Sequence, residues 1–363
     1  MTFNYYTIII GMICGILIFF KLPHLPKTSN TKNTKRLNMS VIIPARNEEI
    51  NLPNILMDLH NQTIKVHEII CVDDSSEDKT PEIIKEYGAT EITVSELPSG
   101  WKGKTWACQN GARAATGDIL LFLDADVRLS DTAIESLISI YNNKQNPISV
   151  QPYHKMKKQY EYFSLFFNLI EICSTGMCLL RKKNTYGFYG PVFMVSKELF
   201  DLHGGYEIVK NHVIEDFSLG NYYSKKGVKI DLFTGNKEIR FRMYPESFFG
   251  LFEGWSKNFS AGSLSTKAWL LIMTICWVAC LTAIPIEIIR SIAGGNAISV
   301  TVILVIYLFN ALFIYRVAKN IGNFPLYVCL LYPIYLILFH FTFIYSFLGT
   351  YIFKSTTWKG RKL

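Results

Sequence analysis

Two aspartates, Asp124 and Asp126, stand one residue apart directly after the apolar run 119–123. Five apolar residues after a Gly-Asp turn predict a strand buried on both faces, as in a parallel sheet. Ligands gather at the carboxyl ends of strands in open α/β sheets. Because hard cations prefer carboxylate oxygens, this pair is suited to a divalent cation that bridges two phosphate oxygens. An isolated Asp-x-Asp is more often a solvated turn, so the surrounding sequence must decide between the two interpretations.

Other predicted strands also end in polar residues. The apolar runs 40–44 and 68–72 lead into Ala45-Arg46-Asn47-Glu48 and into Asp73-Asp74. Strands over 40–44, 68–72, 90–95 and 119–123 alternate with helices predicted over 52–59, from Thr80 onward and over 105–116. This alternation predicts an α/β fold with a right-handed, mostly parallel sheet. Three polar strand ends in one sheet are hard to explain by core packing alone.

The composition favours a membrane partner over nucleic acid. Half of the 363 residues are hydrophobic, the mean hydropathy is +0.20 and the net charge is +8. The Lys and Arg residues flank apolar segments and form no compact basic stripe, so we expect membrane lipids and no nucleic acid as partners. The eight cysteines show no CxxC pair or Cys/His ligand spacing, which predicts reduced cytosolic thiols.

Apolar segments lie at both ends of the chain. The run 5–20 lacks a basic residue before it and a small-residue cleavage site after it, so it predicts an uncleaved anchor. The basic residues that follow it place the next domain in the cytoplasm, in a multi-pass protein of the cell membrane. We predict an anchor over 1–22, a basic linker over 23–38, a central domain over 39–265, transmembrane segments over 266–353 and a basic tail over 354–363.

Two of the carboxyl-terminal apolar segments predict membrane spans, and the third allows two arrangements. Residues 269–286 and 297–315 are each long enough to cross a bilayer. The run 324–353 is broken by Pro333 and predicts either one tilted helix or two short pieces that return to the same side. The basic tail favours the second arrangement.

Three stretches together resemble the family 2 glycosyltransferases with a GT-A fold. They are VIIPARNEE at 41–49, VDDSSED at 72–78 and DAD at 124–126, and the resemblance covers about residues 39–265. It implies a nucleotide-sugar transferase domain with a Rossmann-like sheet. One departure is Ser75, where the family commonly has glycine after the two aspartates.

The resemblance also implies a role for each strand end. Asp74, with Asp73 as the alternative, would accept hydrogen bonds from the nucleobase, and Pro44, Ala45 and Glu48 would line the nucleoside pocket. Asp124 would reach the ribose and the metal, and Asp126 would hold a divalent metal, Mg²⁺ or Mn²⁺, on the diphosphate. Lys104 precedes a predicted helix in a Gly-Lys segment that is suited either to phosphates or to a solvated loop. Trp255 lies in a region that resembles the diphosphate site of related membrane transferases, although it would also suit a membrane interface.

Candidates for catalysis and acceptor binding follow in the second half of the domain. Residues 213–220 resemble the family's acidic motif at a helix start, in which Asp216 would act as general base beside Glu215. Adjacent acids at a helix start are also favoured by the helix dipole alone. Residues 148–153 predict a strand, and His154 after it is expected to be structural. Residues 158–178 predict an apolar helix that either packs in the core or guides a lipophilic acceptor.

The resemblance implies an inverting transfer from a UDP-sugar to a lipophilic acceptor at the membrane. Stretches 42–49, 150–154, 188–192, 241–244, 253–255 and 358–361 resemble the branch of the family that moves glucose from UDP-glucose onto a C30 carotenoid carboxylate. Other pigment or lipid pathway enzymes would then be its neighbours. Two alternatives remain: transfer to a hydroxyl-bearing lipid or growing polysaccharide, and a non-enzymatic receptor for nucleotide sugars. Whether the purified protein hydrolyses or transfers from UDP-sugars distinguishes the receptor from an enzyme.

Overall fold

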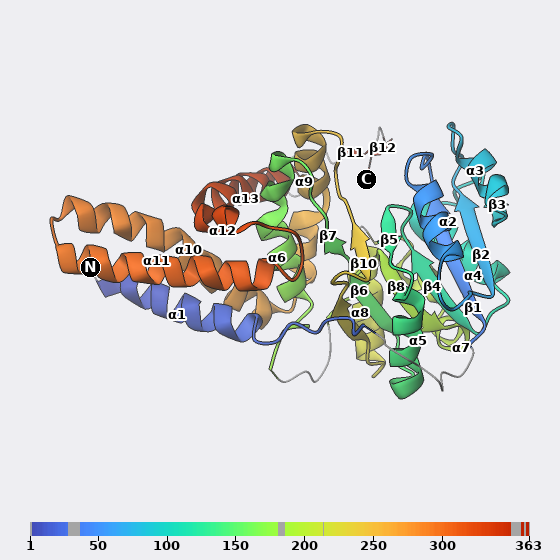
Figure 1. The fold of residues 1–363 in the computed structure, drawn as a ribbon, viewed down its shortest axis with the longest axis horizontal. Coiled ribbons are helices and arrows are strands. Elements are labelled where there is room, and N and C mark those ends of the chain that lie inside the picture. Colours follow the sequence, from blue (N-terminus) through green and yellow to red (C-terminus); the bar gives the residue numbers. More distant parts are fainter. Residues whose placement is uncertain are drawn as a thin grey trace. The chain divides into compact units, whose positions relative to one another are not determined.

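The computed structural model describes residues 2–27, 37–180, 186–212, 214–349, 357–358 and 361–362 (Figure 1). The chain divides into two compact units, which are described separately. An α/β unit comprises Pro23–His154 and Asn184–Arg242, and a helical unit comprises Met1–Leu22, Lys155–Lys183 and Met243–Leu363. Segments 155–183 and 243–265, which the sequence grouped with the central domain, therefore cluster with the helices. Most of the predicted basic linker and tail lies outside the described residues.

The main sheet of the α/β unit is mostly parallel, as predicted. Its strand order is β3-β2-β1-β4-β8-β6-β9. β1 pairs in parallel with both β2 and β4, while β8 is antiparallel to β4 and to β6. The strands span Met39–Ala45 (β1), Glu68–Asp73 (β2), Thr90–Thr93 (β3), Ile119–Leu123 (β4), Ile148–Gln151 (β6), Val192–Ser196 (β8) and Asp231–Thr234 (β9). Because β2, β1 and β4 are neighbours and run in parallel, their carboxyl ends share one edge of the sheet.

Helices cover this sheet through apolar or very small side chains. α2 buries Leu52, Ile55, Leu56 and Leu59, the residues that the sequence pattern predicted. α4 instead packs through small residues: a Cβ added at Gly111 would lie 2.5 Å from Ile42 Cγ2. The helices span Leu52–His60 (α2), Thr80–Glu86 (α3), Gly103–Ala114 (α4), Ala133–Lys144 (α5), Lys197–Leu202 (α7), Gly205–Val209 (the 3₁₀ helix η2) and Glu215–Lys225 (α8).

The first strand of a second, three-stranded sheet begins directly after Asp126. It consists of β5 (Val127–Leu129), β10 (Ile239–Phe241) and β7 (Tyr153–His154). The single strand predicted over 148–153 was therefore wrong: Pro152 separates β6 from β7, and the two strands belong to different sheets. Proline has no N–H for a continuous ladder, so the strand ends there.

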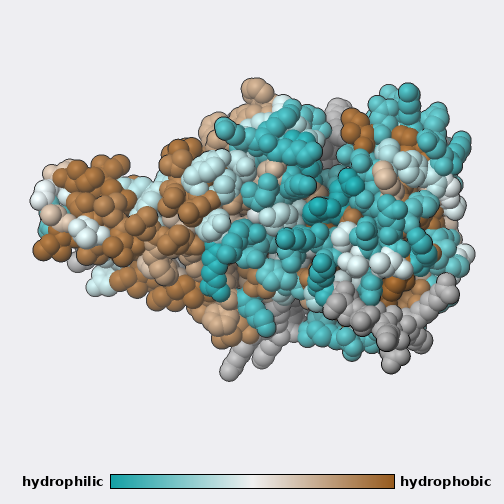
Figure 2. Space-filling model, viewed as in Figure 1, coloured by the Kyte–Doolittle hydropathy of each residue, from teal (hydrophilic) through white to brown (hydrophobic). Residues whose placement is uncertain are grey.

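The helical unit contains the apolar segments. Its helices span Thr2–Ile18 (α1), Gln159–Ser164 (the 3₁₀ helix η1), Leu165–Ser174 (α6), Phe248–Ser265 (α9), Ala268–Ala293 (α10), Ala297–Ala318 (α11), Leu326–Leu330 (α12) and Tyr332–Phe347 (α13), and two short strands follow at Thr357–Trp358 (β11) and Arg361–Lys362 (β12). Hydrophobic residues dominate the visible surface of α1, α10 and α11 (Figure 2). Among the described residues, α10 and α11 are long and apolar enough to cross a bilayer, and α1 and α13 are shorter apolar helices.

One helix prediction in this unit needs correction, and one choice between alternatives can be made. The helix predicted over 158–178 begins as the 3₁₀ helix η1 and ends as α6 at Ser174. For 324–353 the described residues form two pieces, which was one of the two alternatives, and the break lies at Leu331 between the short α12 and α13. Pro333 stands at the start of α13, where its missing N–H and fixed φ are tolerated.

Candidate active site

Two loops at the carboxyl edge of the main sheet hold each other in place. The backbone N–H groups of Asn47, Glu48 and Glu49 donate to Ser76 Oγ (3.0 Å), Thr80 Oγ1 (2.9 Å) and Asp78 Oδ2 (3.0 Å). In return, the Glu77 N–H donates to Asn47 Oδ1 at 2.8 Å. The loops after β1 and β2 are thus cross-linked, which fixes the positions of Glu48 and Asp74.

The backbone of Ser75 is left-handed, a conformation that glycine adopts most easily. Ser75 has φ of +57°, a conformation in which a side chain is sterically unfavourable. Its hydroxyl donates to the Val94 carbonyl at 3.1 Å. This hydrogen bond ties the turn to the segment after β3.

The two aspartates at the end of β2 are separated by their surroundings. Asp73 is only 3% exposed, and its carboxylate accepts hydrogen bonds from the backbone N–H and the hydroxyl of Ser76. Asp74 remains 15% exposed, with Arg46 Nη1 at 3.4 Å. A Cβ added at Gly103 would lie 2.4 Å from Asp74 Oδ2, so the start of α4 passes directly over this carboxylate. Asp73 therefore holds the turn, and Asp74 is the carboxylate of the pair that is available to a ligand.

The two carboxylates after β4 lie in an acidic environment. Burial, followed by the nearby charges of Asp124 and Glu48, raises the pKa of Asp126 to about 7, and Lys104 acts in the opposite direction. A divalent cation would relieve this repulsion, and two or three carboxylate oxygens are a suitable part of its ligand set. Within the described ranges no group of three His, Cys, Asp or Glu side chains is spaced to hold a metal alone. Asp124 and Asp126 therefore fit a cation whose other ligands come from a diphosphate or water.

Lys104 is the cation at the centre of the site. Its ammonium lies 2.8 Å from Asp124 Oδ1, and the side chain is 38% exposed. Burial lowers the pKa of Lys104, but Asp124, Asp216 and Glu215 outweigh it and hold the pKa well above its ordinary value. Lys104 thus joins the acid at the end of β4 electrostatically to the acids at the start of α8.

The Asp216 carboxylate lies against the backbone of Gly190, where a larger residue would collide with it. Glu215 and Asp216 lie in the first turn of α8. A Cβ added at Gly190 would lie 2.0 Å from Asp216 Oδ2. The next turn of α8 is equally close, since a Cβ at Gly220 would lie 2.5 Å from the Cα of Gly187, which has φ of +98°. The 187–191 segment therefore lets α8 approach and place its acids beside Lys104.

The remaining predicted residues lie in different settings. Pro44 and Ala45 end β1, and Ala45 is paired with Asp73. His154 is fully buried in β7 against Phe241, in agreement with a structural role. Trp255 belongs to the helical unit, where its ring is 7% exposed, stacks on Phe167 at 4.8 Å and donates to Ser164 Oγ at 3.1 Å. Its diphosphate role stays a prediction, and in this structure the indole is occupied by packing.

The sequence analysis did not predict how three residues shape the site. Gly103 and Gly190 matter through the absence of a Cβ, and Arg46 through its position beside Asp74. Their only sequence signals are the Gly-Lys and Gly-Pro segments and the motif at 41–49. A close backbone approach becomes visible only when the partner segment is in place.

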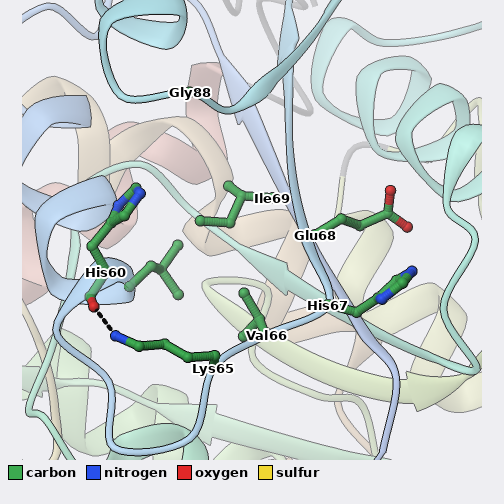
Figure 3. A pocket seen from close by; sticks show the side chains of 8 residues that line it. His60, Lys65, Val66, His67, Glu68, Ile69 and Gly88 are labelled. Carbon is green, nitrogen blue, oxygen red and sulfur yellow. Dashed lines mark hydrogen bonds between the residues drawn. The ribbon is translucent and has the colours of Figure 1, made fainter.

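A separate depression lies at the opposite end of β2 (Figure 3). It has a volume of about 250 Å³ and is lined by Leu59, His60, Lys65, Val66, His67, Glu68, Ile69 and Gly88. Glu68 there accepts hydrogen bonds from Ser40 Oγ (2.6 Å) and from the Thr116 N–H (2.7 Å), which join β1, β2 and the turn before β4. This depression is at the amino end of the strand, away from the acidic edge.

The sheet order and the acidic strand ends define a nucleotide-sugar transferase fold, and the chain belongs to glycosyl transferase family 2. The family model matches residues 40–204. Curated relatives extend the match over most of the chain. A 4,4'-diaponeurosporenoate glycosyltransferase of Staphylococcus aureus (strain USA300) is 33% identical over 97% of this chain and 94% of its own length. One of Staphylococcus haemolyticus (strain JCSC1435) is 36% identical over 76% of this chain and 75% of its own.

A solved structure shares the fold. It is a mannosyltransferase of Pyrobaculum calidifontis in complex with GDP-mannose and Mn²⁺, with a TM-score of 0.58 and 15% identity. The likeness covers 94% of this chain and 98% of that chain. The family match and the named relatives make the protein a glycosyltransferase, and the shared structure shows that its fold is GT-A.

Proposed function

We propose that this protein is a membrane-bound inverting glycosyltransferase that moves glucose from UDP-glucose onto a C30 carotenoid carboxylate. The observation that carries the proposal is the convergence of Asp124 and Asp126 with Glu215 and Asp216 around Lys104, with Asp74 beside the neighbouring Gly103. The names of relatives matched over nearly the full chain support the acceptor.

The chain's own residues supply the donor site. Asp74 accepts hydrogen bonds from the nucleobase at the edge formed by Pro44, Ala45 and Glu48, and Asp124 reaches the ribose. Lys104 contributes positive charge beside the departing diphosphate. A divalent cation held by Asp126 and Asp124 would supply Lewis-acid stabilisation of that leaving group.

The transfer to a carboxylate is balanced without a proton. A carboxylate oxygen forms a bond to C1 of glucose while the bond from C1 to the β-phosphate oxygen breaks, and UDP leaves with the electron pair. A carboxylic acid with a pKa of about 4 to 5 is already an anion at neutral pH. Asp216 then has no proton to accept, and its place beside Lys104 serves to orient the groups around the sugar.

The helical unit supports a position in the membrane. Only 33% of the most apolar window of α10 and 22% of that of α11 is buried inside the protein, unlike the core helix of a water-soluble enzyme. Gly15 of α1 lies at Trp277 and Gly11 at Cys280, so α1 and α10 are antiparallel. One end of these helices carries Lys21, Lys267, Arg316 and Lys319, and the other carries Glu287 and Arg290. By the positive-inside rule, the basic end is cytoplasmic.

The test is transfer by the purified protein in detergent. UDP-[¹⁴C]glucose and diaponeurosporenoate should give one labelled carotenoid per UDP released, and mild alkali should cleave the label because a glycosyl ester is alkali-labile. An alkali-stable labelled lipid would instead identify a hydroxyl acceptor. Absence of both transfer and UDP release with every UDP-sugar tried would overturn the donor as well as the acceptor.

A further inference from the structure

A pair of tryptophans with flanking cations lies next to the candidate active site and has no role in the chemistry above. The rings of Trp101 and Trp106 lie 4.9 Å apart at an angle of 57°. Lys210 Nζ lies 6.0 Å from the Trp101 ring centre, and the Arg113 guanidinium lies 5.6 Å from that of Trp106. Both indoles are partly exposed, so each retains surface that a ligand can cover.

The segment that carries Trp101 touches every part of the site. Gly103 lies over Asp74, and Lys104 is paired with Asp124. At its other end, a Cβ added at Gly100 would lie 2.6 Å from Asn211 Oδ1. Trp101 is therefore at the end of the segment that meets the loop leading into α8.

Lys102 connects the tryptophan pair to the acids of α8. Its side chain is partly buried, and burial lowers the pKa of Lys102 while the charge of Glu215 acts to raise it. Lys102 follows Trp101 in the chain and is subject to the charge of Glu215, and Lys210 lies over the Trp101 ring. In the proposed function the nucleobase binds at Asp74, which lies beside Gly103.

Flat apolar surface beside ammonium groups matches one chemistry. An indole face binds an extended conjugated chain by dispersion and area burial, and Lys ammonium groups bind a carboxylate. We propose that Trp101, Lys102 and Lys210 form the acceptor subsite, in which the terminal part of a polyene lies on Trp101 and its carboxylate lies between the two lysines. This subsite deepens the proposed function and rests on it for the identity of the acceptor.

The two lysines of the subsite also offset the repulsion that an anionic acceptor would meet at the active site. Glu215 and Asp216 repel an anionic acceptor, and Lys104 is already engaged by Asp124. Two further cations on the acceptor side offset that repulsion at short range. A hydroxyl acceptor would need no such cations.

The experiment compares Trp101→Ala, Trp101→Phe, Lys102→Gln and Lys210→Gln with the parent, and uses Lys85→Gln as control because Lys85 is 72% exposed. Three quantities are measured in the full-length protein: the KM for diaponeurosporenoate, the Kd of UDP-glucose, and the Kd of diaponeurosporenoate by calorimetry without donor. Trp101→Ala and each lysine variant should weaken the acceptor constants about tenfold, with the UDP-glucose Kd unchanged. Trp101→Phe should recover most of the loss, and Lys85→Gln should match the parent.

A charge-neutral competitor sharpens the result. The primary alcohol that corresponds to diaponeurosporenoate should compete more weakly than the acid in the parent, and about equally in the Lys102→Gln, Lys210→Gln double variant. Unchanged acceptor binding, or a parallel loss of UDP-glucose binding, would overturn the subsite. Failure of the parent to transfer glucose while it still binds the acid at Trp101 would overturn the proposed function and leave the subsite standing.

Discussion

The carboxylates of the site differ in the partners that surround them. Asp73 is occupied by Ser76, Asp124 by Lys104, and Asp74 faces a partly exposed Arg46. Asp126 instead lies among carboxylates that disfavour its charge. At the residue scale, Asp126 is therefore the acid that gains most from a bound cation.

We expect Asp126→Asn to lower metal-dependent transfer at least about 100-fold, because a Lewis-acid contribution of several kcal/mol is lost. The substitution is nearly isosteric and removes repulsion, so thermal stability should not fall. Transfer is measured against Mg²⁺ and Mn²⁺ concentration. The exposed Asp131→Asn serves as control. Full activity of the variant at low metal concentration, or of the parent in excess chelator, would contradict the metal role.

Gly190→Ala should disable the site by moving the whole start of α8, with Glu215 and Asp216, relative to Lys104, which is a larger change than loss of the Asp216 charge alone. The new Cβ would lie 2.0 Å from Asp216 Oδ2, so the carboxylate must move. A misplacement of about 1 Å can cost about 100-fold in rate. We expect this loss in kcat at nearly unchanged UDP-glucose affinity. Gly250→Ala, whose Cβ would meet nothing closer than 3.5 Å, should leave activity intact.

Asp216→Asn tests the acceptor class. General-base assistance is worth about 10²- to 10⁴-fold, but a carboxylate acceptor has no proton to lose. We therefore expect a loss well below 100-fold with diaponeurosporenoate. Transfer rates are measured against pH for parent and variant, with UDP-sugar binding as the check on folding. A thousandfold loss in a variant that binds donor normally would point to a hydroxyl acceptor.

At the scale of elements, glycines decide how closely helices approach. In α1, a Cβ at Gly11 would lie 2.3 Å from the Cys276 carbonyl oxygen, and one at Gly15 would lie 2.4 Å from Trp277 Cδ1. The Gly-x-x-x-Gly spacing places both on one face of α1, where two apolar helices can meet backbone to backbone. In the same unit the Tyr332 hydroxyl donates to the Leu281 carbonyl at 3.2 Å. Pro285 leaves that carbonyl without its helical partner, so the hydroxyl replaces the missing N–H.

Gly11→Val should separate α1 from α10. The obstacle at Gly11 is backbone, which cannot move aside as a flexible side chain could. We expect a destabilisation of about 1–3 kcal/mol, measured as a lower midpoint of thermal unfolding in detergent. Ile13→Val on the same helix is the control, since Ile13 is 52% exposed. Equal midpoints for both variants would show that α1 does not depend on this contact.

At the scale of the whole molecule, the prediction concerns the side of the membrane on which the α/β unit lies. Its native thiols are poor reporters: Cys71 and Cys108 are at most 1% exposed, and burial raises the pKa of Cys71 to about 12. We expect Lys85→Cys, placed at an exposed position, to be protected from an impermeant maleimide in intact spheroplasts and labelled after lysis. Equal labelling before lysis would reverse the proposed topology.

The sequence alone predicted strands β1 to β4 and the acids that follow them, but not strands β5, β8, β9 and β10. Continuous apolar runs such as 119–123 specify a strand buried on both faces, and the polar residues after them lie at the edge where we propose that the donor binds. The local pattern over 148–153 did not show that Pro152 divides this stretch between two sheets, and it left open whether 324–353 forms one helix or two. The spacing of apolar residues indicates whether a segment is a helix or a strand and how it is buried. It does not indicate which other element the segment pairs with.

What the tertiary structure decided is the arrangement of groups that are distant in the chain. It assigned Asp73 to a turn and left Asp74 accessible, placed Lys104 between two acid pairs, and seated Asp216 against Gly190. None of these follows from residue type, because a carboxylate's role depends on what surrounds it, and a missing Cβ matters only where another segment comes close. The residue types identified the candidate site residues, and their packing in the folded chain determined which of them remain accessible to a ligand.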